Sequence, residues 1–462
     1  MVRRTPKAPR QETPLLDLAE RLEGCREVAL GFAEGQARAE ALRCLDCKEP
    51  VCIDACPLHI DIRSFIRSVI EGDYGEAFRI IARDNPFPDI CGRVCQHELY
   101  CEKACLLGKK LPPVAIGSLE RFVAEHRTPE AVALCRNGGP KVAMVGSGPA
   151  SLIAAYDLIR LGYHATVFEA LHDFGGVLRY GIPPFRLPRP VIDEEIDRLR
   201  RLGVEFVSDF IVGRTCTLDD LFADGYSAVF VATGAGLPYL MNIPGEMLIG
   251  VYTANEFLTR INLMEAWRFP QSTTPVHPGQ RAVVVGGGNA AMDAARWARR
   301  LGCETTILFR RSRAELRARL EEIKRAEEEG ARFEFLAAPV RILGDEKGVV
   351  TEVECIRMRL SEPDESGRPS PVPIEGSEYR IPADVVVAAI GQAPNPTLQR
   401  ATPSILTRKG KIVVDDSGQT SVRGVFAGGD VVRGGSTVIL AMRDGRAAAQ
   451  AIHRALTGGE AG

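Results

Sequence analysis

The sequence predicts an α/β protein in which two Rossmann-like nucleotide-binding domains follow a cysteine-rich α-helical domain. Two segments share one strand–glycine turn–helix–strand pattern, and most cysteines lie before the first of these segments. The breaker run Asn137-Gly138-Gly139-Pro140 separates the two regions and indicates a domain boundary. Two copies of this pattern in one chain indicate nucleotide binding more strongly than either copy alone.

Composition excludes several classes of protein. The 462 residues are 45% hydrophobic and 26% charged, with a net charge of −2, which suits about three domains of roughly 100–200 residues each. No apolar run approaches the roughly 18 residues that a membrane-spanning helix needs, and the charge does not favour nucleic acid. The first 14 residues are basic and are not followed by the apolar core of a signal peptide, so we expect a cytoplasmic protein.

The expected domain boundaries follow from these shifts in pattern. Residues 1–14 are expected to be a flexible basic tail, and residues 15–136 the helical domain. Residues 137–265 and 385–462 are expected to form one nucleotide-binding domain in two segments, with the other domain, 266–384, between them.

Hydrophobic periodicity also predicts individual elements. An amphipathic helical stretch covers 62–81, and a hairpin with a polar loop covers 343–378. Apolar strands are expected over 384–391 and 424–430, and a final helix over 437–456.

The cysteines indicate metal chemistry, because eight of the thirteen lie between Cys44 and Cys105. The first group has the spacing Cys44-x2-Cys47-x4-Cys52-x3-Cys56-Pro57. Such runs bind iron–sulfur clusters, and the cysteine before proline usually serves a second cluster. The first cluster then needs one ligand in addition to Cys44, Cys47 and Cys52, and the second cluster needs three ligands in addition to Cys56.

A second group, Cys91-x3-Cys95-x5-Cys101-x3-Cys105, can supply the missing ligands. Zinc is the competing metal, because C-x2-C pairs also form tetrahedral sites. His97, which lies among these cysteines, is expected to be a surface polar residue and not a ligand.

The first glycine turn predicts a pyrophosphate cradle. Gly146 permits the tight turn after the strand 141–145, and Gly148 lets the backbone approach the ligand at a helix N-terminus. Ser151 stands where the pattern has its third glycine. Glu169 follows 23 residues after Gly146, where a carboxylate accepts hydrogen bonds from a ribose.

The second turn, Gly286-Gly287-Gly288, leads to a strand that ends in arginine and not in an acid. Arg310 and Arg311 lie at that strand end and Arg317 lies further on, so a 2′-phosphate would be held by charge-assisted hydrogen bonds and NADP(H) is favoured over NAD(H). The alternative is that these arginines bind no phosphate and form only a solvated basic edge of the domain.

These motifs resemble a known family. The chain is similar to the small (beta) subunit of glutamate synthase and to the N-terminal region of dihydropyrimidine dehydrogenase, most of all to the branch containing the large subunit of NADH-dependent reduced ferredoxin:NADP oxidoreductase, a bifurcating transhydrogenase, and sulfide dehydrogenase. The stretches that carry the resemblance are Cys44–Pro57, Ile90–Cys105, Ala115–Phe122, Gly181–Pro188 and Val425–Val432, and Gly250–Met264 carries the choice of branch.

The resemblance implies glutathione-reductase-like FAD and NAD(P)H domains and two 4Fe–4S clusters. One cluster would be held by Cys44, Cys47, Cys52 and Cys105. The other would be held by Cys56, Cys95, Cys101 and a carboxylate, Glu120, which leaves Cys91 as a bystander. The alternative is that Cys91 is the fourth ligand and that Glu120 is an exposed helix residue.

The resemblance also assigns the dinucleotide contacts, and it assigns no catalytic acid, base or nucleophile. FAD would be bound by Gly146, Gly148, Pro149, Ala150, Ser151, Glu169, Gly176, Val177, Arg186, Asp430 and Thr437. NADP(H) would be bound by Gly287, Gly288, Asn289, Ala290, Arg310, Arg311, Arg317 and Gly391.

Together these groups predict an oxidoreductase that converts between paired and single electrons, since nicotinamide carries two electrons together, a cluster carries one, and flavin exchanges both ways. No cysteine lies between Cys135 and Cys216, which disfavours disulfide reductase chemistry. Electrons are expected to reach a second subunit, either a flavin–iron–sulfur protein that handles NAD(H) and ferredoxin or a large glutamate synthase subunit. A zinc-stabilised docking subunit without activity is the alternative from another class.

Overall fold

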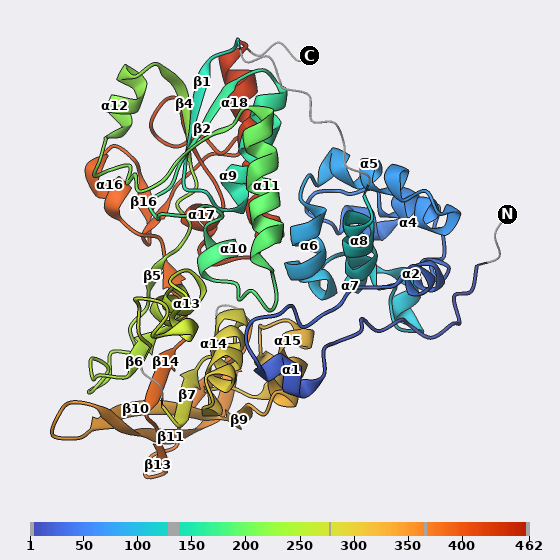
Figure 1. Cartoon of the computed structure of the whole chain (residues 1–462). Coiled ribbons are helices and arrows are strands. Elements are labelled where there is room, and N and C mark those ends of the chain that lie inside the picture. The colour runs from blue at the N-terminus through green and yellow to red at the C-terminus, as the bar shows by residue number, and fades with distance from the viewer. Residues whose placement is uncertain (1–3, 128–137, 277–278, 365–366, 459–462) are drawn as a thin grey trace.

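A helical domain and two α/β domains meet at a common junction (Figure 1). The computed structural model describes residues 4–127, 138–276, 279–364 and 367–458. The helical domain lies at the right of Figure 1, the first α/β domain at the upper left and the second at the lower left. The long helix α11 (Arg189–Leu202) stands between the first α/β domain and the helical domain.

The helical domain consists of short helices: α2 Glu34–Ala41, α3 Val51–Asp54, α4 Ile62–Glu71, α5 Tyr74–Asp84, α6 Pro88–Val94, η1 His97–Leu99, α7 Cys101–Ala104, η2 Leu106–Lys109 and α8 Ile116–Glu125. The amphipathic stretch expected over 62–81 is two helices and not one. Gly72 ends α4 with a φ of 82°, and the Asp73 side chain accepts a hydrogen bond from the backbone N–H of Glu76 to start α5.

The N-terminal segment leaves the helical domain and packs on the α/β domains. Helix α1 (Leu18–Leu22) lies beside α15 in Figure 1, and Arg21 forms an ion pair of 2.7 Å with Glu328 of α15. Further along, the N–H of Val28 donates to the carbonyl of Phe185 at 3.0 Å. Residues 18–28, which were expected to belong to the helical domain, therefore connect that domain to the two α/β domains.

The first α/β domain has a five-stranded parallel sheet in the order β18-β4-β1-β2-β3. Its strands are β1 Lys141–Val145, β2 His164–Phe168, β3 Glu205–Val207, β4 Tyr226–Val231 and β18 Val425–Ala427. Helix α9 (Pro149–Arg160) follows the first glycine turn and packs on α18 (Val438–Leu456). The contact is close, because a Cβ on Gly445 would lie 2.0 Å from the carbonyl oxygen of Ala150.

The second α/β domain repeats this architecture, with the parallel order β6-β14-β7-β8-β9. Its main elements are β6 Val251–Thr253, α13 Ala254–Asn262, β7 Arg281–Val285, α14 Asn289–Arg300, β8 Glu304–Phe309, α15 Leu320–Glu328, β9 Arg332–Phe335 and β14 Val385–Ala388. The expected boundaries at 265/266 and 384/385 therefore need correction, because β6 and β14 pair with the second sheet. Periodicity predicted the strand at 385–388 but carries no information on which sheet it joins.

The hairpin expected over 343–378 is an antiparallel sheet that starts earlier. It is built from β10 Ala337–Gly344, β11 Val350–Pro363, β12 Pro369–Pro373 and β13 Tyr379–Pro382. The strand expected over 424–430 is β18, and the final helix expected over 437–456 is α18. The remaining elements are α10 Val177–Tyr180, α12 Leu218–Ala223, η3 Ala266–Arg268, η4 Arg313–Glu315, α16 Thr397–Ala401, α17 Asp430–Arg433 and the short strands β5 Leu237–Pro238, β15 Gln392–Ala393, β16 Thr407–Arg408 and β17 Lys411–Ile412.

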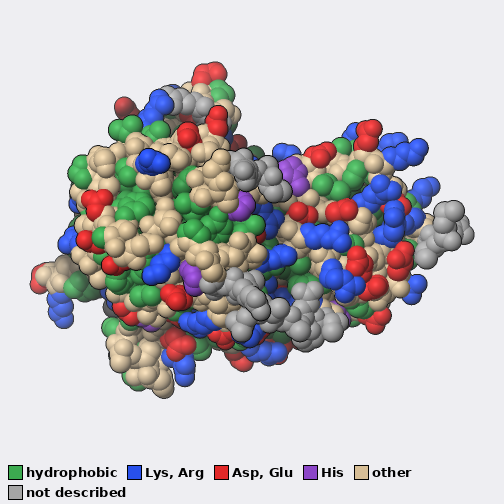
Figure 2. Space-filling view, turned by 90° about the horizontal axis from the view of Figure 1, so that it is seen from above, with side chains coloured by type: hydrophobic (Ala, Val, Ile, Leu, Met, Phe, Trp, Pro, Cys, Tyr) green, Lys and Arg blue, Asp and Glu red, His purple; other side chains and the backbone are tan. Residues whose placement is uncertain are grey.

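The surface differs between the lobes. In the view from above, charged side chains of both signs crowd the helical domain, whereas the larger lobe shows more apolar and uncharged surface (Figure 2). Over the described residues, no helix has the length and hydropathy to cross a membrane.

Candidate functional site

The first group of cysteines lines one cavity of the helical domain. Its thiols come from the loop after α2, from α3 and the loop before it, and from the residue after α7: Cys44, Cys47, Cys52 and Cys105. Apolar side chains, among them Ile62 and Ile66 of α4, form much of the remaining wall. All four cysteines are partly exposed, so this cavity lies near the surface. The fold brings together the four thiols assigned to one cluster.

The environment of these thiols disfavours a free thiolate. Burial, together with the neighbouring Cys44 and Cys105 thiols, raises the pKa of Cys52 to about 12. Burial also raises the pKa of Cys44. Such thiols are protonated at neutral pH, and they become ligands when a cationic centre displaces the proton.

The second group lies deeper in the same domain. Cys56, Cys95 and Cys101 are buried, and Glu120 of α8 is only 4% exposed. Burial raises the pKa of each thiol, and the charge of Glu120 raises it further. These four side chains therefore share one interior region, and the alternative that Glu120 is an exposed helix residue is wrong.

One hydrogen bond holds the carboxylate of Glu120, and a histidine that makes no hydrogen bond through Nε2 lies beside it. Asn85 Nδ2 donates to Glu120 Oε1 at 2.6 Å, and His97 Nε2 lies 3.5 Å from Oε2. The expectation of a surface position for His97 is wrong, because this side chain is buried. Space for its ring comes from Gly117, where a Cβ would lie 2.3 Å from the imidazole.

Cys91 is buried beside the same group but also contacts the first α/β domain. Its Sγ lies 3.5 Å from Sδ of Met442 on α18. Burial raises the pKa of Cys91, as does the charge of Glu120, so the choice of Glu120 over Cys91 as fourth ligand stays a prediction.

Neither group has the geometry of a site for one metal ion. Among the described residues, no three His, Cys, Asp or Glu side chains converge on a point that a single ion could occupy. In a 4Fe–4S cluster each ligand binds a different iron, so the ligands stand farther apart than around one zinc ion.

The first glycine turn leaves an open cradle at the N-terminus of α9. Gly146 has a φ of 98°, and a Cβ there would lie 2.6 Å from the carbonyl oxygen of Ala232. By contrast, a Cβ on Gly148 would meet nothing within 4 Å. Ser151 is buried, and its Oγ has no hydrogen-bond partner. An anionic ligand with hydrogen-bond acceptors fits this open space and the free N–H groups of the helix.

The other residues expected at FAD mostly surround this cradle. Glu169 Oε2 accepts from the N–H of Ser147 at 2.9 Å, and a Cβ on Gly176 would lie 2.9 Å from the Cα of Gly148. Asp430 begins α17, burial raises its pKa, and it accepts a hydrogen bond from the N–H of Ser436 at 3.1 Å.

The last three residues lie at element ends: Val177 at the start of α10, Thr437 as the N-cap of α18, and Pro149 as the first residue of α9. Ala150 is next to the cradle and 3.4 Å from a Cβ placed on Gly429. The segment before α17 therefore reaches the first turn, although it is far away in sequence.

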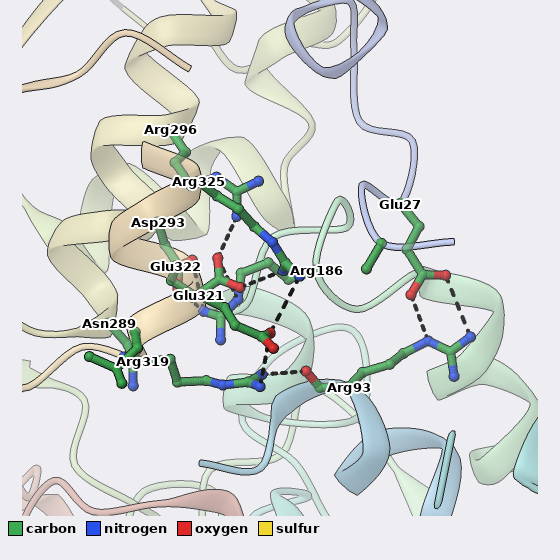
Figure 3. A network of polar contacts seen from close by, with 12 residues as sticks. Glu27, Arg93, Arg186, Asn289, Asp293, Arg296, Arg319, Glu321, Glu322 and Arg325 are labelled. Atoms are coloured by element: carbon green, nitrogen blue, oxygen red, sulfur yellow. Dashed lines mark hydrogen bonds and ion pairs between the residues drawn. The ribbon is translucent and has the colours of Figure 1, made fainter. Parts of the chain in front are cut away.

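Arg186, which was expected to contact FAD, pairs with carboxylates of the second α/β domain. Its Nη1 donates to Asp293 of α14 at 2.7 and 2.8 Å, and its Nε is 3.3 Å from Glu322 of α15 (Figure 3). Burial raises the pKa of Asp293 to about 6, against the effect of Arg186. The segment 181–188 is thus a bridge between the two α/β domains, and the guanidinium is occupied by two carboxylates of the second domain.

The second glycine turn has the same backbone design. Gly286 has a φ of 147°, and a Cβ there would lie 2.3 Å from the carbonyl oxygen of Ala389, which brings the turn leading to Gly391 beside it. A Cβ on Gly288 would meet nothing within 4 Å. Asn289 and Ala290 begin α14, so this helix also presents free N–H groups to an open space.

Four arginines gather beyond the end of β8. Burial and the charge of Arg311 lower the pKa of Arg310. Arg368, from the hairpin loop, was not predicted from the sequence; burial lowers its pKa, and so do Arg317, Arg311 and Arg310. Arg311 also forms an ion pair of 2.6 Å with Asp364. A phosphate group would relieve the repulsion within this cluster.

Fold and sites together define a class of enzyme: an NAD(P)H-dependent flavin oxidoreductase with an iron–sulfur domain. Residues 21–132 match the family model of dihydropyrimidine dehydrogenase domain II, 4Fe-4S cluster, and residues 140–445 match that of the pyridine nucleotide-disulphide oxidoreductases. The structure of Mycobacterium tuberculosis FprA in complex with NADPH shares the fold, with a TM-score of 0.56 and 21% identity over 69% of this chain and 85% of FprA.

Within this class, the chain belongs to the glutamate synthase small-subunit family. It is 36% identical to the small chain of the NADPH glutamate synthase of Escherichia coli (strain K12), over 92% of this chain and 93% of that one. It is 40% identical to the beta subunit of the NADP(+)-dependent formate dehydrogenase of Moorella thermoacetica over 88% of its length, and it spans 60% of that protein. By name, both relatives are subunits of larger enzymes.

Proposed function

We propose that this chain passes electrons between NADPH and two 4Fe–4S clusters by way of FAD, toward a partner subunit. The order of the sites carries the proposal. The buried group of Cys56, Cys95, Cys101 and Glu120 adjoins the first α/β domain, and the partly exposed group lines a cavity near the surface. This order suits a path from the interior to a docked partner.

The proximity of the three sites supports the path. Tyr100, next to Cys101, shares a hydrogen bond of 3.0 Å between its Oη and Oγ1 of Thr437, the residue expected at the flavin. The two cysteine groups are adjacent in sequence. Cys52 lies in α3 and Cys56 lies two residues after its end, while Cys101 begins α7 and Cys105 follows its last residue. The groups are thus held close to each other and to the first dinucleotide site.

FAD, when bound, supplies the exchange between electron pairs and single electrons. The chain binds and orients. The turn Gly146–Ser151 holds the pyrophosphate, Glu169 accepts from the ribose, and the N-terminus of α18 favours negative charge near Thr437. The arginine cluster at the end of β8 selects the 2′-phosphate of NADPH. No side chain has to act as acid, base or nucleophile.

The partner has two candidate forms. The first is a flavin–iron–sulfur subunit that handles NAD(H) and ferredoxin, as in the ferredoxin:NADP transhydrogenase branch; the stretch 250–264 favours it. The second is a large glutamate synthase subunit that uses the electrons to make glutamate. The match to the E. coli small chain over nearly the full length of both proteins favours the second. In either case we place the enzyme in the cytoplasm.

Anaerobic purification from the native host tests the proposal. We expect about eight iron atoms and one FAD per chain for two 4Fe–4S clusters, and a second subunit in the same fraction. Cys52→Ser and Cys56→Ser should each remove about half of the iron, whereas Cys216→Ser, far from both groups, should remove none. A colourless protein, or one that holds zinc and no iron, would refute the proposal.

The fourth ligand of the buried cluster needs its own pair of variants. Glu120→Ala should lose one cluster signal in electron paramagnetic resonance (EPR) spectra, while Cys91→Ala should keep both. The reverse result would make Cys91 the ligand.

A further inference from the structure

The segment Arg317–Leu320 of the second α/β domain is attached to the dinucleotide turn on one side. The N–H groups of Arg317 and Ala318 donate to the carbonyl of Gly287 at 2.9 and 3.2 Å. The N–H of Arg319 donates to Oδ1 of Asn289 at 2.9 Å. The backbone of this segment is therefore held by the same turn that is expected to hold NADP(H).

The other side of the segment is attached to the loop of the helical domain that contains Cys95. Gln96 Nε2 donates to the carbonyl of Arg317 at 3.3 Å. The N–H of Leu320 donates to Oε1 of Glu98 at 3.2 Å. Arg319 Nη1 donates to the backbone carbonyl of Arg93 at 2.6 Å (Figure 3). Four residues thus connect the second dinucleotide site to one cluster loop.

Arg319 places a buried positive charge at this junction. Its side chain is 6% exposed, and its Nε has no hydrogen-bond partner. The carboxylates that face it are Glu98 at 3.8 Å and Glu321 at 3.3 Å, with Glu322 further away. Glu321 is half exposed, so water screens its charge more than that of Arg319.

The charge of Arg319 lies against the loop that carries the cluster ligand. Its Nη1 donates to the carbonyl of Arg93, two residues before Cys95, and Gln96, the residue after Cys95, is bonded to the same segment. Reduction of a 4Fe–4S cluster by one electron adds one negative charge to the cluster and its thiolates. A nearby fixed cation in a poorly solvated site stabilises the more negative state.

We propose that Arg319 is a positioning residue that stabilises the reduced state of the cluster held through Cys95, and that it does so from the NADP(H)-binding domain. The inference rests on the proposed function, because it needs the cluster. The inference goes beyond the proposed function, because it makes the reduction potential of this cluster depend on how the second α/β domain is docked.

A redox titration monitored by EPR spectroscopy tests the proposal on the anaerobic holoenzyme. In Arg319→Met, one of the two cluster signals should titrate at a lower potential than in the wild type, and the other should stay in place. Arg319→Lys keeps the charge and should restore most of the shift. Arg313→Gln is the matched control, because Arg313 lies on the same loop but is exposed and paired with Glu327.

The outcomes separate the two proposals. A wild type without cluster signals refutes the proposed function and this inference with it. Full iron content in Arg319→Met with both signals at wild-type potentials overturns the inference alone. A shift of the same size in Arg313→Gln, or in Arg319→Lys, also overturns it, because the effect would then not depend on a buried charge at residue 319. If Arg319→Met loses iron, Arg319→Lys decides: full iron content with both potentials near those of the wild type supports the role of the charge.

Discussion

The two glycine turns share a backbone and differ in what closes them. Gly146 and Gly286 each donate an N–H to a residue near or at the end of the next strand, to Phe168 at 2.8 Å and to Leu308 at 3.0 Å. Around the first turn, Gly176 and α18 approach, and Glu169 supplies a carboxylate. The second turn is closed by the segment 317–320 and by arginines.

The helices that follow the two turns also differ in the residues that pack against them. Ile153 and Asp293 occupy the fifth position of α9 and α14. Ile153 packs near Gly445 of α18, whereas Asp293 pairs with Arg186 from the interdomain bridge. The turn itself therefore specifies only that a dinucleotide binds. The residues around the turn specify which dinucleotide binds and which other site it lies next to.

The largest expected effect comes from filling one cradle at a time. Gly148→Val should lower the FAD content more than tenfold, because the side chain enters the open space while the extended backbone of Gly148 tolerates it. Gly288→Val, the matched change in the second turn, should keep the FAD and raise the KM for NADPH. Flavin absorbance and steady-state kinetics measure both. Loss of FAD in Gly288→Val would show that the two sites are not separate.

The arginine cluster should set the choice of nucleotide. Arg310→Ala and Arg317→Ala should each raise the KM for NADPH about tenfold to a hundredfold, since a charged hydrogen bond contributes about 1.5–3 kcal/mol. The KM for NADH should change little. Arg311→Ala is a poorer test, because Arg311 also pairs with Asp364. An equal loss with NADH would contradict a role in binding the 2′-phosphate.

The sequence predicted the features that depend on local pattern. Both glycine turns, the strands beside them and the final helix follow from periodicity and from glycine at fixed positions. The sheet that receives the strand 385–388 was not predictable, because pairing partners lie more than 100 residues away in the chain. Sequence spacing alone also left open which cysteines form a group.

Three site residues show why the rest could not be predicted. His97 is buried only because Gly117 of α8 leaves room for its ring. Arg186 lies in a motif shared with the family, yet its position is set by Asp293 and Glu322 of another domain. Arg368 joins the arginine cluster from a hairpin loop. In each case the decisive neighbour is distant in sequence.

Glu169→Gln should have a smaller effect than either glycine variant. The carboxylate accepts from the N–H groups of Ser147 and Leu171, both at 2.9 Å, and the amide keeps its shape but loses its charge. We expect the Kd for FAD to rise about tenfold, the cost of weakening one charged hydrogen bond. Fluorescence titration of the apoprotein with FAD measures it. An unchanged Kd would mean that Glu169 serves the turn and not the ribose.

A prediction about stability concerns Asp293 and distinguishes the helix after the second turn from the one after the first. Because burial raises the pKa of Asp293 from 3.8 to about 6, the folded chain keeps its proton where the unfolded chain has lost it. Its contribution to stability is thus greatest below pH 4 and declines as the pH rises to about 6. Relative to Asp293→Asn, the wild type should lose about 2–3 kcal/mol over this range. Thermal midpoints of both proteins from pH 4 to 7 measure this difference, and a constant difference would show that Arg186 keeps Asp293 ionised throughout.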